Sequence, residues 1–123
     1  MFEDKNFDEL NIIARKLVLN NQWDDTAIEV NKRIIEKKIN YPGAHTRLAK
    51  CLLAKGDRKG AYEIYKKVLE FDPNNTISWN FVKCEEFSVR EKKQRKKNEE
   101  RIAEELEEKR KKDIQIKRMI SEI

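Results

Sequence analysis

The sequence predicts an all-α fold: tandem antiparallel helical hairpins in a short α-solenoid, followed by a long charged C-terminal helix. Only 3 Gly and 2 Pro occur in 123 residues, too few to supply the frequent turns of a β-sandwich or barrel. Apolar residues recur three and four positions apart, which is the spacing of one helical face. Charged residues make up 41% of the chain and crowd its C-terminal end, where a core cannot form.

Four segments of about a dozen residues each carry one apolar helical stripe. In chain order, the stripes are Leu10, Ile13, Ala14 and Leu17; Ala27, Val30, Ile34 and Ile35; Leu48, Ala49, Leu52 and Leu53; and Ala61, Ile64, Tyr65, Val68 and Leu69. Capping and turn residues separate the segments: 20–22, then Asp24 or Asp25, 40–43, 56–57 and 72–73. Short joints between such helices predict two hairpins, and each hairpin must stack on a neighbour to bury its stripe.

The second hairpin carries a specific motif. Counted from Pro42 as position one, apolar or small residues fall at seven, eight, eleven and twenty, Gly56 at fifteen, Tyr65 at twenty-four and Pro73 at thirty-two. This pattern resembles the 34-residue tetratricopeptide repeat, in which small residues at eight and twenty let the paired helices approach closely. Here Ala49 and Ala61 occupy these two positions.

The resemblance extends over residues 7–89. The first hairpin matches from Phe7, although Asn31 stands where an aromatic residue is usual. Thr76 begins a third unit that keeps only its first helix, and we expect Trp79, Val82 and Phe87 to cover the second repeat. The expected organisation is therefore a repeat domain over 7–89 and a charged helical extension over 90–123.

The extension carries its charge in blocks. Residues 90–97 sum to +5, 99–108 to −5 and 109–118 to +5. No Gly or Pro follows Pro73, so we expect the third-unit helix to continue through these blocks without a stop.

Three roles are open for this helix. It is a solvated helix held by acid–base pairs, a coiled coil, or a polyanion-binding arm that uses the two basic blocks. A seven-residue seam favours the coiled coil, with Lys109 and Asp113 as interruptions; its apolar members are Ile102, Leu106, Ile116, Ile120 and Ile123. Acidic blocks stacked on each other would repel, so a paired helix must be staggered.

Composition and motifs argue against other classes of protein. No segment approaches the roughly 18 apolar residues of a membrane span, and no export signal precedes Phe7, so we expect a cytoplasmic protein with reduced thiols. Cys51 and Cys84 lie 33 positions apart, on adjacent first helices, which predicts two separate thiols. The lone His45 has no catalytic partner in motif spacing, so we expect it to pack. We therefore predict no enzyme, no metal and no cofactor.

The remaining candidate for function is a surface. In the family that this chain resembles, the first helix of each hairpin lines a concave groove that binds a peptide. The positions that face the ligand correspond here to Asn11, Arg15, Thr46, Arg47, Lys50, Asn80, Cys84 and Phe87. The carboxylate clamp that holds chaperone tails is not matched, because Ile77 and Phe81 stand at its third-unit positions.

The sequence thus predicts a protein–protein interaction scaffold whose mildly basic groove binds a partner protein or an acidic peptide. Two alternatives remain open. One is association with nucleic acid or another polyanion through 90–97 and 109–118, and the other is a homodimer through the C-terminal helix.

Overall fold

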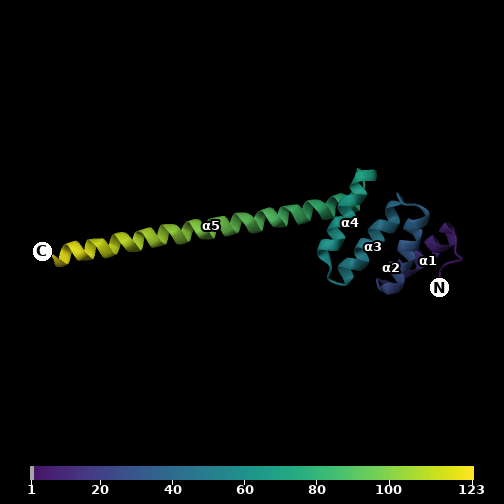
Figure 1. Cartoon of the computed structure of the whole chain (residues 1–123), viewed down its shortest axis with the longest axis horizontal. Coiled ribbons are helices and arrows are strands. Elements are labelled where there is room, and N and C mark those ends of the chain that lie inside the picture. The colour runs from purple at the N-terminus through teal and green to yellow at the C-terminus, as the bar shows by residue number, and fades with distance from the viewer. Residues whose placement is uncertain (1) are drawn as a thin grey trace. The chain divides into compact units, whose positions relative to one another are not determined.

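The computed structural model describes residues 2–123 and is all-helical over that range (Figure 1). Its helices are α1 (Phe7–Leu19), α2 (Asp25–Lys37), α3 (Pro42–Ala54), α4 (Arg58–Phe71) and α5 (Thr76–Ser121). The four short helices pack in sequence, each against the next along the chain. The predicted fold class of tandem hairpins with a long charged helix is therefore confirmed.

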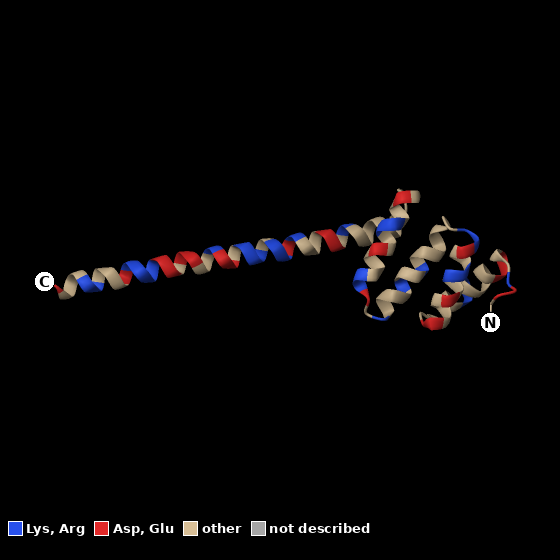
Figure 2. Cartoon of the chain, viewed as in Figure 1, with Lys and Arg blue, Asp and Glu red and all other residues tan. Residues whose placement is uncertain are grey.

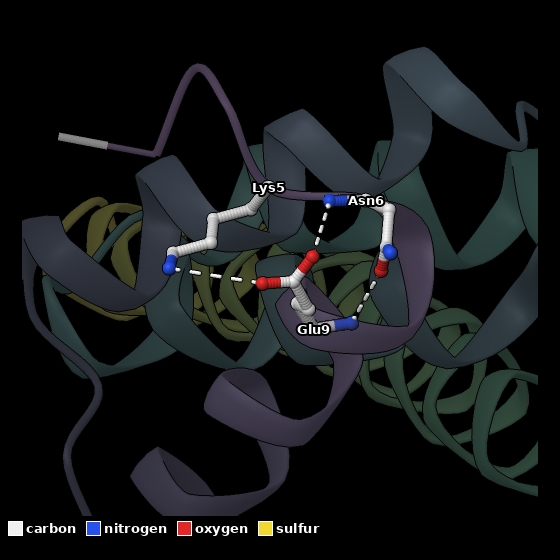
Figure 3. Close-up of polar contacts among 3 residues, drawn as sticks. All are labelled: Lys5, Asn6 and Glu9. Atoms are coloured by element: carbon white, nitrogen blue, oxygen red, sulfur yellow. Dashed lines mark hydrogen bonds and ion pairs between the residues drawn. The ribbon is translucent and has the colours of Figure 1, made fainter.

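The helix ends follow the capping residues. Asn6 caps α1 in a capping box, in which its side chain accepts the Glu9 amide at 2.9 Å and its own amide donates to the Glu9 carboxylate at 3.4 Å (Figure 3). The same carboxylate lies 3.7 Å from the Lys5 ammonium (Figure 3). Of the two candidates for the next cap, Asp24 is the residue that caps α2.

Two apolar clusters form the core of residues 2–85. The first joins α1, α2 and the start of α3, with Leu10, Val30 and Ile34 fully buried and Phe2 folded against them. The second joins α3 and α4 to the beginning of α5 through Ala49, Ala61 and Tyr65. Ala49 and Ala61 have no exposed surface, so the two positions predicted to hold small residues lie where helices meet.

The first turns of α5 pack as predicted at Val82 but not at Trp79 and Phe87. Ser78 and Val82 are buried, and the Phe81 ring lies 4.7 Å from that of Tyr65. Trp79 and Phe87, which we expected on the covering face, are 48% and 65% exposed. The helical turn explains the exposure of Phe87, because this residue is rotated by about 140° from the buried Val82 around the axis.

The chain divides into two compact units, residues 1–85 and 86–123, with α5 contributing to both. No residue of 86–123 is buried, and blocks of basic and acidic residues alternate along this part of α5 (Figure 2). Glu91 pairs with Arg95 at 3.8 Å, and Glu107 pairs with Arg110 at 2.9 Å. Within residues 2–123, no helix has the length and apolar character needed to cross a membrane.

Candidate peptide-binding groove

A pocket of about 520 Å³ opens on one face of residues 2–85. It is lined by side chains from α1, the α1–α2 joint, α3, α4 and the start of α5: Arg15, Val18, Leu19, Trp23, Thr46, Arg47, Lys50, Tyr65 and Ile77. The lining has two parts, a cationic group of Arg15, Arg47 and Lys50 and an apolar group that includes Trp23 and Tyr65. None of the lining residues is Asp or Glu, so no carboxylate of the lining balances the three positive charges.

Arg47 is the most tightly held of these cations. Its Nε donates to Oδ1 of Asn31 at 2.8 Å, and its Nη2 donates to Oδ1 of Asn11 at 3.0 Å. Both asparagines are buried, and Asn31 in turn donates from Nδ2 to the Ala27 carbonyl at 2.8 Å. Two neutral amides therefore fix the guanidinium without cancelling its charge.

The environment of Arg47 disfavours that charge. Burial is the largest influence and lowers the pKa of the guanidinium below its ordinary value; the Tyr41 hydroxyl opposes this effect, and the positive charge of Arg15 adds to it. The arginine remains protonated even so, because a guanidinium is too basic to lose its proton near neutral pH. A partly desolvated cation with neutral partners gains more from an incoming carboxylate than a solvated surface lysine does.

Lys50 and Trp23 connect the cationic and apolar parts of the pocket. The Lys50 ammonium lies 4.9 Å from the centre of the Trp23 ring, within cation–π range. The indole N–H of Trp23 donates to the Asn21 side chain at 2.9 Å, which fixes the ring. Asn21 has a left-handed backbone (φ 52°), a conformation that Asn tolerates better than most residues.

The structure places the eight predicted groove residues in three groups. Arg15, Thr46, Arg47 and Lys50 line the pocket. Asn11 lies beneath it, buried, and orients Arg47. The remaining three, on α5, are exposed and do not line the pocket: Asn80, Cys84 and Phe87.

Sequence reasoning missed several residues of this site. Trp23 lies in a joint between helices, where periodicity gives no signal. Tyr65 comes from a second helix, which the family pattern does not assign to the groove, and Ile77 was considered only as a departure from the carboxylate clamp. Asn31 did carry a signal, because an amide in place of the usual aromatic on an apolar stripe needs a buried partner.

The histidine and the two cysteines do not line the pocket. His45 is buried, with Nε2 2.6 Å from the Ile39 carbonyl oxygen and its ring 5.2 Å from that of Phe71. Cys51 and Cys84 are free thiols, and burial raises the pKa of Cys51. Among residues 2–123, no three His, Cys, Asp or Glu side chains cluster as metal ligands would.

Comparison with protein-family models and with curated proteins gives no match for this sequence.

Proposed function

We propose that residues 2–85 form a non-enzymatic interaction module of the tetratricopeptide type, whose pocket binds an acidic segment of a partner protein. Buried Ala49 and Ala61, Pro42 in the first turn of α3 and Pro73 just after α4 support the family assignment. The observation that carries the binding proposal is Arg47, a half-buried cation held by two amide oxygens in a pocket lined without a carboxylate.

The two parts of the pocket define the ligand. Arg47, Arg15 and Lys50 favour a carboxylate, while Trp23 and its apolar neighbours favour a large aliphatic or aromatic side chain. The matching ligand is a peptide in which Asp or Glu stands next to Leu, Phe or Trp. A single pocket of this size supports a weak, transient interaction.

The test uses two fluorescein-labelled octapeptide libraries, one with Glu fixed beside Leu, Phe or Trp and a matched one with Gln in place of Glu. In fluorescence anisotropy, the full chain should bind peptides of the Glu library more tightly than peptides of the Gln library. Arg47→Gln should weaken binding of the selected peptide about tenfold or more, since a charge-assisted hydrogen bond is lost.

Lys59→Gln is the matched control, because it removes the same charge at an exposed residue of α4 outside the pocket. Circular dichroism must show equal helicity in both variants. Equal binding of the Glu and Gln libraries, or equal losses in the two variants, would refute the proposal.

A further inference from the structure

The second unit, residues 86–123, presents an apolar seam with no cover. Ile102, Leu106, Ile116 and Ile120 are 49–64% exposed, and no residue of this unit is buried. Their positions follow the alternating steps of four and three that keep one face of a helix toward a paired helix. From Ile102 to Ile120 the seam is about 27 Å long at 1.5 Å per residue.

Two charged residues interrupt the seam at its centre. Lys109 and Asp113 take the two middle positions of the same four-three spacing. Neither forms an ion pair within the part of the chain that the structure describes, although neighbours such as Arg110 and Glu107 do. A partner for this seam must therefore accept a cation and an anion between two apolar segments.

A second copy of the same helix, running antiparallel, meets both requirements in one register. When residue numbers on facing helices sum to 222, Ile102 lies opposite Ile120 and Leu106 lies opposite Ile116. The same sum places Lys109 opposite Asp113. The two-fold symmetry repeats each pairing, so four apolar layers flank two ion-pair layers.

The charge blocks fit this register. Glu104 and Glu105 lie at the same level along the axis as Arg118 and Lys117 of the second copy, so the acidic block of one helix runs beside a basic block of the other. The basic residues Arg110, Lys111 and Lys112 lie level with the same three residues of the second copy at the two-fold axis, and the 2.9 Å pair of Arg110 with Glu107 in the same helix reduces that repulsion.

Parallel pairing in register fails at the same positions. It would set Lys109 against Lys109 and Asp113 against Asp113 inside the seam, where like charges are poorly screened. It would also stack each acidic block on its copy. Ile123 continues the spacing but would face Glu99 in the antiparallel register, so it adds no apolar layer.

We propose that the seam from Ile102 to Ile120 binds a second copy of this chain as an antiparallel coiled coil, with Lys109 and Asp113 as reciprocal ion pairs that set the orientation. The polar pair specifies one orientation at a cost in stability, as polar residues in coiled-coil seams do. The dimer involves residues 102–120 and does not depend on the peptide-binding pocket.

Disulfide trapping in the full chain tests the orientation. In a Cys84→Ser background, Leu106→Cys and Ile116→Cys chains are mixed and oxidised. The antiparallel register predicts mixed disulfides between the two variants and little product from either variant alone. Ile114→Cys, exposed but off the seam, is the matched control. Self-linked Leu106→Cys product, or mixed product no greater than with the control, would overturn the proposal.

Charge exchange provides a second test that needs no cysteine. Sedimentation equilibrium of the unmodified chain over a concentration series should show a monomer–dimer equilibrium. Lys109→Asp should weaken dimerisation about tenfold or more, because carboxylates then face each other. The double exchange Lys109→Asp with Asp113→Lys should restore it. A single-chain mass at every concentration, or no rescue by the double exchange, would contradict the antiparallel pairing.

Discussion

The hydrogen bond from Arg47 to Asn31, a polar residue on the apolar stripe of α2, fixes the main cation of the candidate pocket. A carboxylate at position 31 would have neutralised the guanidinium within the chain, whereas the buried amide holds it at 2.8 Å and leaves its charge available. In the proposed site, the amide at position 31 is therefore what leaves the Arg47 charge free for a ligand carboxylate.

The substitution Asn31→Asp tests this directly. The introduced carboxylate should pair with Arg47, lower the positive potential of the pocket and reduce binding of the selected acidic peptide about tenfold. Anisotropy measures the loss, and circular dichroism checks that helicity is kept. Asn74→Asp, an exposed change of equal charge, should leave binding intact; equal effects of the two changes would remove the special role of position 31.

Asp24 gives α2 a pH-dependent stability. Its carboxylate accepts the Ala27 amide at 3.2 Å and the Gln22 side chain at 2.9 Å, and these hydrogen bonds lower its pKa. A pKa below that of the unfolded chain stabilises the fold above the unfolded value and loses that contribution as pH falls through the folded value. Asn at position 24 is also a good cap but does not titrate. As the pH falls from 6 to 3, the Tm of Asp24→Asn should therefore rise relative to the Tm of the wild type. A Tm difference independent of pH would contradict this assignment.

Ser78 is a buried residue whose hydroxyl finds no hydrogen-bond partner within the described residues. Ser78→Ala removes this unsatisfied group and adds a better helix former, so we expect the free energy of unfolding to rise by about 1 kcal/mol. Urea denaturation measures the change. Ser88→Ala on the exposed face of α5 is the control, and a loss of stability in Ser78→Ala would show that the hydroxyl has a partner after all.

At the scale of the elements, local chemistry accounts for most helix ends. Asp57 accepts the Gly60 amide at 2.9 Å and begins α4, and Gly56 follows α3 with a left-handed backbone (φ 85°). Sequence reasoning located these stops because capping involves only a few neighbouring residues. It misplaced the packed face of early α5, because Trp79 and Phe81 are both aromatic and only contact with Tyr65 decides which is covered.

Gly56→Ala should therefore destabilise the fold by about 1 kcal/mol, since a Cβ disfavours the left-handed backbone. No side chain crowds this position, so the cost is conformational rather than steric. Urea denaturation checks it, and Gly56→Asn, which tolerates this backbone better, should lose less. Equal stability of wild type and Gly56→Ala would show that the turn adopts another conformation.

Only part of the pocket lining could be predicted from the sequence. Arg15, Thr46, Arg47 and Lys50 were predictable because they share the groove-facing positions of first helices. Trp23 and Tyr65 were not, since the pocket forms only once α1, α3 and α4 have packed. Asn80, Cys84 and Phe87 were assigned by continuing the repeat into a helix whose packed face differs.

For the molecule as a whole, two basic surfaces are candidate binding sites for acidic ligands. Residues 2–85 offer the pocket around Arg47, while 90–97 and 109–118 offer exposed charge outside any pocket of that unit. Binding to the blocks would be a counterion-release effect that falls steeply with salt, whereas the pocket adds burial of an apolar side chain. The dependence of binding on salt therefore distinguishes the proposed pocket site from general electrostatic association with the basic blocks.

The most direct test of peptide binding compares the indole N–H signals of the two tryptophans, because Trp23 lines the pocket and Trp79 does not. The full chain, labelled with ¹⁵N, is titrated with the selected acidic peptide at 150 mM salt, and ¹H–¹⁵N spectra follow the indole N–H signals. We expect the signals of the Trp23 indole N–H and the Arg47 Nε–H to shift on peptide binding, while the signal of the Trp79 indole N–H stays in place. Shifts confined to the amides of 90–118, with the Trp23 indole unchanged, would contradict it.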